Sequence, residues 1–165
     1  LLFDLPARNR SLRLRLWRWL RQNHFGFLQE SAWLHVDPVA QLTAALAEYR
    51  DDVESLALLE AQCVAGCSDA ALVAGAWDFV EINKRYTAYL DRFGRKHAFA
   101  IASGRGTVAW ASRWLRSERI AWKHALDIDP LLPRALLPPG YRGAEAWEAR
   151  RRLVRALLTA LSRGR

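Results

Sequence analysis

Residues 2–34 read LFDLPARNRSLRLRLWRWLRQNHFGFLQESAWL, and this stretch decides the fold class. A short apolar segment ends in Phe3-Asp4-Leu5-Pro6, and a strongly basic amphipathic helix follows it. The segment from Phe25 to Leu34 then predicts two short strands with a polar turn between them. A strand, a helix and a hairpin in this order form the first half of a ferredoxin-like βαββαβ domain.

The predicted helix has two contrasting faces. One stripe has the spacing that buries a helix against a sheet, and it consists of Leu12, Leu16, Trp19 and Leu20. The opposite side carries Arg10, Leu14, Trp17, Arg18 and Arg21. Arginine-rich outer faces are commonly just solvated, but an apolar patch on a charged face tends to mark a contact surface. We therefore predict that Leu14, Trp17 and Arg18 contact a second subunit or domain.

The remainder of the first domain repeats the pattern of helix and strand. Asp37-Pro38 is a good helix start, and it precedes apolar residues at helical spacing, namely Val39, Leu42, Leu46 and Tyr49. Residues 53–64 then supply a fourth apolar strand. We predict a ferredoxin-like domain over residues 1–66.

Beyond Gly66 the pattern becomes helical, which predicts an all-helical domain over residues 67–165. Helices are expected from Trp77 to about Phe93, from Thr107 to about Lys123, and over about 144–162. In the last helix we expect an inward stripe of Trp147, Val154, Leu158 and Leu161. Residues 127–143 hold four prolines among ten positions, so they form neither a long helix nor a central strand but an ordered connector. The predicted fold class is α+β.

Two sets of residues resemble known families. Phe3-Asp4-Leu5-Pro6, the basic helix and Leu28-Gln29-Glu30-Ser31 resemble both the small CRISPR-associated spacer-acquisition proteins and the middle domain of the PaaX-like transcriptional repressors of phenylacetate degradation. The second half separates these families. Its patterns Trp77-Asp78-Phe79, Asn83-x-x-Tyr86, Asp129-Pro130-x-Leu132-Pro133 and Tyr141-x-Gly143 are similar to the C-terminal domain of PaaX-like repressors, whereas spacer-acquisition proteins are too short to have this region.

The PaaX-like resemblance implies a larger protein and several partners. Such repressors begin with a winged helix-turn-helix that binds operator DNA, and the chain, which has no methionine and begins as the interior of a strand, is expected to be a fragment without it. The resemblance also implies a homodimer, because paired DNA-reading modules mirror two-fold symmetry. It implies an aromatic acyl-CoA effector, such as phenylacetyl-CoA, whose binding releases the repressor from DNA.

A ligand of this kind needs an apolar slot for its ring and cations for its phosphates. The helix from Thr107 offers Trp110 and Trp114 one turn apart, with Arg113, Arg119 and Lys123 nearby, and Tyr86 on the preceding helix could face them. We predict these six residues as the effector site. The alternative is that the aromatic residues are ordinary core, as most helical aromatic stripes are.

Two other functions remain open. In spacer-acquisition proteins an aspartate ending the first strand can hold a metal across a dimer axis, and Asp4 matches that place, which would suit Mg²⁺ in a nuclease. Asp in Asp-x-Pro is also a common turn and capping residue. A dimerisation module without a ligand is the other alternative. We expect no enzyme activity, because no nucleophile motif is present and the histidines lack metal spacing.

Further bounds come from composition. The net charge of +8 is compatible with a DNA-facing protein. We expect no cofactor, and we expect Cys63 and Cys67 to be reduced structural thiols. Residues 103–107 predict a turn and a helix cap rather than a P-loop. Because neither a membrane span nor a secretory signal is visible, we expect no membrane partner and a cytoplasmic location.

Overall fold

Four short strands pair into one antiparallel sheet in the computed structural model, which describes residues 1–4, 10–47, 55–62, 64, 66, 68–94 and 108–163. The strands are β1 (Leu2–Asp4), β2 (Gly26–Gln29), β3 (Ala32–Leu34) and β4 (Ser55–Ala57). Helix α1 (Arg10–Gln22) lies between β1 and β2 in the sequence, and α2 (Val39–Leu46) lies between β3 and β4. The spatial order is β2-β3-β1-β4. The predicted strand over residues 53–64 is therefore much shorter in its described part than expected.

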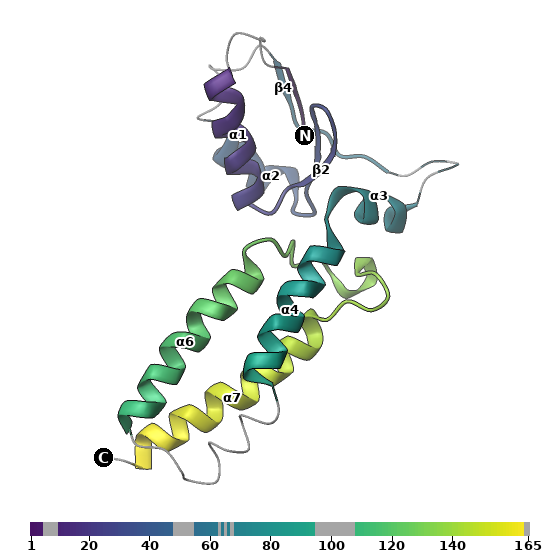
Figure 1. The fold of residues 1–165 in the computed structure, drawn as a ribbon. Coiled ribbons are helices and arrows are strands. Elements are labelled where there is room, and N and C mark those ends of the chain that lie inside the picture. The colour runs from purple at the N-terminus through teal and green to yellow at the C-terminus, as the bar shows by residue number, and fades with distance from the viewer. Residues whose placement is uncertain are drawn as a thin grey trace. The chain divides into compact units, whose positions relative to one another are not determined.

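The core of this region lies between the sheet and the two helices, which Figure 1 shows together on one side of the strands. Leu16 and Leu20 of α1 are fully buried, as the helical spacing predicts. They join Phe3, Phe25, Trp33 and Leu46 in one apolar cluster. A mixed structure of helices and a small antiparallel sheet confirms the α+β prediction at this level.

Trp17 corrects the prediction for the outer face of α1. Its ring lies 5.7 Å from that of Phe27 and 5.8 Å from that of Trp33, so it packs against the core. Leu14 does point outward, with 55% of its surface exposed, and Arg18 is exposed as well. The physical reason is reach: a large indole at the edge of the helix face gains more from covering the sheet aromatics than from contact with water.

Helix α3 (Asp69–Ala76) packs against the edge strand β2. Ser68 caps its N-terminus, with the Ala71 amide donating to the Ser68 hydroxyl at 3.2 Å. Immediately after the helix, the Trp77 indole nitrogen donates to the His24 carbonyl oxygen at 3.2 Å. Gly26 allows strand β2 to lie close to the Trp77 ring, because a Cβ at that position would lie 2.6 Å from the ring.

In the remaining region the structure describes three helices, namely α4 (Phe79–Phe93), α6 (Val108–Leu126) and α7 (Gly143–Arg163). Each contacts the other two, and Figure 1 shows them running side by side. The inward stripe of α7 differs from the predicted one. Ala146, Ala149, Leu153 and Leu157 are buried, whereas Trp147 is 39% and Leu158 53% exposed. The buried stripe thus lies one position before the predicted Trp147, Val154 and Leu158, and small alanines make up its first half.

Backbone contacts divide the chain into two compact units. The first, here called the sheet unit, comprises Leu1–Asp78 and Pro130–Pro138, and the second, the helical unit, comprises Phe79–Asp129 and Pro139–Arg165. The connector returns to the sheet unit with Leu132 buried and a single 3₁₀ turn, η2 (Arg134–Leu136), that contacts α3. The division into domains between residues 66 and 67 stays a prediction.

Some predictions lie outside the described residues. These concern Cys63, Cys67, residues 103–107 and the side chain of Asp4. Among the helices that the structure describes, none has the length and hydrophobicity that a membrane-spanning segment needs.

The contact between β2 and α3 gives a first testable prediction. Gly26→Ala places its Cβ 2.6 Å from Trp77 and 2.8 Å from Ala76, so we expect a loss of about 1–3 kcal/mol in the free energy of unfolding from overpacking. The matched control is Gly75→Ala on α3, whose Cβ meets only Leu28 at 3.9 Å and which gains helix propensity of about 0.5–1 kcal/mol. Urea unfolding measures both, and equal stability of the two variants would contradict the packing described.

Candidate functional site

The helical unit is organised around a buried carboxylate, Asp129, which is fully enclosed. The hydroxyl groups of Tyr86 and Tyr141 both donate to Asp129 Oδ2, the second at 2.5 Å. Burial, reinforced by the adjacent carboxylate, raises the pKa of both phenols far above the usual value. Asp129 therefore ties α4 to the segments that precede and follow the connector.

A second buried carboxylate joins all three helices. Glu118 of α6 has no exposed surface, and its Oε1 accepts from the Tyr89 hydroxyl of α4 at 2.9 Å and from Arg150 Nε of α7 at 2.8 Å. The Arg150 guanidinium also lies 4.9 Å from the centre of the Trp122 ring. Burial raises the pKa of the Tyr89 phenol, with Glu118 adding to the effect. These contacts fix the rotation of α6 against its neighbours.

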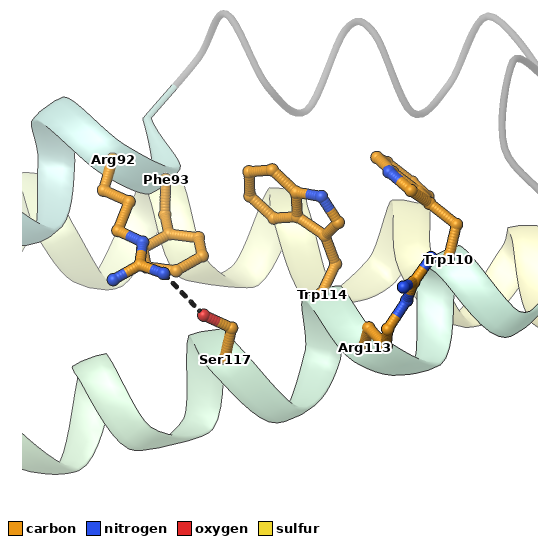
Figure 2. A pocket seen from close by; sticks show the side chains of 6 residues that line it. All are labelled: Arg92, Phe93, Trp110, Arg113, Trp114 and Ser117. Atoms are coloured by element: carbon orange, nitrogen blue, oxygen red, sulfur yellow. Dashed lines mark hydrogen bonds between the residues drawn. The ribbon is translucent and has the colours of Figure 1, made fainter.

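That rotation presents one face of α6 to the end of α4, where a pocket of about 330 Å³ lies (Figure 2). The lining residues that the structure describes are Arg92 and Phe93 from α4, and Trp110, Arg113, Trp114 and Ser117 from α6. The Trp114 ring lies between those of Phe93 and Trp110, with centroid distances of 5.3 Å and 5.6 Å. Edge-to-face contact of Phe93 with Trp114, at an interplanar angle of 88°, is a favourable aromatic arrangement.

Two guanidinium groups add positive charge to this aromatic pocket. Arg92 donates to the Ser117 hydroxyl at 2.8 Å, and its guanidinium carbon lies 5.2 Å from the Phe93 ring centre. Arg113 is exposed on α6. An apolar cavity with a few fixed polar groups is typical of a small-molecule site, and guanidinium groups suit carboxylates and phosphates. The arrangement can therefore hold an aromatic ring that carries an anionic group.

The structure brings together three of the six residues predicted for an effector site, namely Trp110, Arg113 and Trp114. Tyr86 instead lies in the core, bonded to Asp129, and Arg119 and Lys123 are exposed on α6 outside the lining of this pocket. The sequence analysis missed Arg92, Phe93 and Ser117. Phe93 ends the helix predicted from Trp77, but no sequence signal indicates that its ring lies against Trp114.

No group of three or more His, Cys, Asp or Glu side chains in the described parts of the chain has an arrangement that could hold a metal ion.

Comparisons with known proteins identify the family. A family model described as the PaaX protein central Cas2-like domain matches residues 1–73, and one described as the PaaX-like protein C-terminal domain matches residues 77–163. The chain therefore belongs to the PaaX-like family, as its sequence patterns predict.

A solved structure supports the fold. The uncharacterized protein Rv0674 from Mycobacterium tuberculosis matches with a TM-score of 0.61 and 19% sequence identity, over 99% of this chain and 61% of that one. The chain thus spans about three fifths of that protein's length. No curated protein matches the chain at the significance required.

The two phenols bound to Asp129 predict a specific loss of stability at alkaline pH. In the unfolded chain tyrosine ionises at about pH 10. In the folded chain Tyr86 and Tyr141 keep their protons to higher pH, because their pKa values are raised. The unfolded state then binds fewer protons, so the free energy of unfolding is fully retained below about pH 10 and falls as pH rises further. Tyr86→Phe should flatten this fall, by up to about 1.4 kcal/mol per pH unit, as measured by urea unfolding.

Near neutral pH, Tyr86→Phe should also lower the free energy of unfolding by about 1–3 kcal/mol, because Asp129 then has one hydrogen-bond donor fewer. The control is Thr159→Ala, at an exposed position on α7. It should change the free energy of unfolding equally at every pH and leave the alkaline slope as it is. An unchanged alkaline slope in Tyr86→Phe would contradict the pKa shift.

Proposed function

We propose that this chain is the dimerisation and effector-sensing portion of a PaaX-like transcriptional repressor that acts in the cytoplasm and responds to an aromatic acyl-CoA such as phenylacetyl-CoA. The observation that carries the proposal is the pocket between α4 and α6, with its three aromatic rings and two guanidinium groups. Membership of the PaaX-like family supports the regulatory role.

The proposal includes a ferredoxin-like arrangement of the sheet unit, followed by an all-helical domain. Support for the first part comes from the sequence order βαββαβ together with the spatial order β2-β3-β1-β4 and antiparallel pairing throughout. Support for the second comes from α4, α6 and α7, which supply the described regular structure of the helical unit.

The pocket suits only one end of the ligand. A cavity of about 330 Å³ accommodates a phenyl ring with its short acyl chain, while the nucleotide of coenzyme A extends beyond it. Trp110, Trp114 and Phe93 would enclose the ring. Arg113 lines the pocket and is exposed, so it would contact a phosphate of coenzyme A where the ligand extends out of the pocket.

Regulation follows from differential affinity. A dimer of such chains would bind operator DNA through N-terminal winged helix-turn-helix modules, as the family resemblance implies. The acyl-CoA must bind the DNA-incompetent arrangement more tightly, with a coupling free energy of about 1–3 kcal/mol. By linkage, operator DNA would weaken acyl-CoA binding by the same factor.

The pocket is tested by isothermal titration of phenylacetyl-CoA into the chain and two variants. Trp114→Ala removes the central ring and Arg113→Ala removes the charge, and each should weaken binding by about tenfold or more, since about 1.4 kcal/mol corresponds to a factor of ten. The matched controls are Trp147→Ala on α7 and Arg119→Ala on α6, which lie outside the lining and should bind as the unchanged chain does. Unchanged affinity in both pocket variants would remove this site.

The proposal assigns no catalytic activity to the chain, and a metal-dependent nuclease is the alternative that chemistry can test. We expect no Mg²⁺-stimulated cleavage of DNA or RNA, and no effect of Asp4→Asn. Cleavage that requires both Mg²⁺ and Asp4 would establish the nuclease instead. A ligand-free dimerisation module would sediment as a dimer and bind no acyl-CoA, whereas a monomer at all concentrations would remove the dimer from the proposal.

A further inference from the structure

Helix α1 exposes a row of arginines that the effector pocket does not use. Arg10, Arg18 and Arg21 are all exposed, and they share a face with Leu14. The opposite side of the helix is anchored in the core by Leu16 and Leu20, so this face is held in place rather than free to turn. The helix contains no acidic residue along its whole length.

The lack of acidic residues distinguishes α1 from α7, which is the other helix rich in arginine. There, Glu148 lies within 4 Å of both Arg151 and Arg152, and Glu145 pairs with Arg142. Arg151 and Arg152 of α7 thus have a carboxylate one turn away, which reduces the positive potential outside this part of the helix. Helix α1 itself supplies no carboxylate to Arg10, Arg18 or Arg21, so nothing within the helix offsets their positive charge.

The spacing of this face suits a polyanion with regularly placed charges. At a rise of about 1.5 Å per residue, Arg10 and Arg18 lie about 12 Å apart along the helix, and Arg10 and Arg21 about 16 Å. Duplex DNA presents a phosphate about every 3.4 Å along each strand. Three guanidinium groups over this length can each meet a different phosphate group.

We propose that the α1 face binds the sugar-phosphate backbone of double-stranded DNA without reading its sequence. This surface would add to whatever module recognises the operator. The inference takes from the proposed function only that the protein works on DNA, and it does not depend on the acyl-CoA pocket.

Charge and hydrophobicity favour DNA over two other partners. A second copy of the same face would bring like charges together, which is unfavourable. An anionic membrane would attract the arginines, but helices that bind membranes bury a broad apolar face in the lipid. The broad apolar face of α1 is already occupied by the protein core, and Leu14 is the large apolar side chain left on the exposed side.

The test measures binding of the chain to a fluorescently labelled 25-base-pair duplex of arbitrary sequence by anisotropy, over about 50–200 mM salt. The triple variant Arg10→Gln, Arg18→Gln and Arg21→Gln should lower the affinity about tenfold or more at 50 mM salt. It should also reduce the slope of log K against log salt by about 2 to 3, because each lost phosphate contact contributes about 0.9. Arg18→Glu alone should weaken binding in the same direction.

The matched control carries the same loss of charge on α7, as Arg151→Gln, Arg152→Gln and Arg155→Gln, and should retain most of the affinity and the slope. A further set on α6, Arg116→Gln, Arg119→Gln and Lys123→Gln, tests the other exposed cations. Failure of the unchanged chain to bind at 50 mM salt, or equal losses in the three sets, would overturn the assignment to α1. Binding of phosphatidylserine vesicles that depends on the α1 arginines, without DNA binding, would overturn it in favour of a membrane.

Titration of phenylacetyl-CoA separates this inference from the proposed function. The α1 triple variant should bind the acyl-CoA as the unchanged chain does, because its substitutions lie in the sheet unit and the pocket lies in the helical unit. Loss of acyl-CoA binding in the pocket variants with no change in DNA binding would support both proposals. An unchanged chain that binds no acyl-CoA but shows DNA binding dependent on α1 would refute the effector proposal and support this one.

Discussion

The buried carboxylate of Asp129 is the constraint on which the helical unit depends. A buried carboxyl group without hydrogen-bond partners is costly, and here two tyrosine hydroxyl groups supply the hydrogen bonds that offset this cost. One of these donors lies on α4 and the other lies just before α7. Asp129 itself ends the part of the helical unit that precedes the connector. The hydrogen bonds therefore define where the chain leaves the helical unit and where it returns.

Glu118 sets the geometry of the candidate site in the same way. Because its carboxylate faces Tyr89 and Arg150, the adjacent residues of α6 must lie on other faces of the helix. Ser117 and Trp114 consequently meet Arg92 and Phe93 at the end of α4. A buried ion pair is weak support for stability, but it does specify one orientation of the helix over others. The pocket thus depends on a polar contact made one turn further along the same helix, since Trp114 precedes Glu118 by four residues.

Periodicity in the sequence predicted the elements better than the contacts. The stripe of α1 identified Leu16 and Leu20 correctly because apolar spacing reports the centre of a buried face. It failed for Trp17, which lies toward the edge of that face and reaches the sheet through its size. In α7 the alanines at 146 and 149 carry little hydrophobic signal, yet they are buried. Asp129 and Glu118 could not have been recognised as buried, because charged residues usually lie at the surface and their partners are distant in sequence.

The two proposed binding surfaces belong to different units, and this constrains how one could influence the other. The chain passes between the units three times, at Asp78 to Phe79, Asp129 to Pro130 and Pro138 to Pro139. Asp129 stands at one of these passages, and its donors Tyr86 and Tyr141 are both residues of the helical unit. A ligand can shift an equilibrium only if it binds two states with different affinity. A ligand seated between α4 and α6 would meet this condition if it altered the packing of α4, because α4 carries Tyr86 as well as Phe93. The Asp129 cluster is then the element of the helical unit through which such a change would reach the connector.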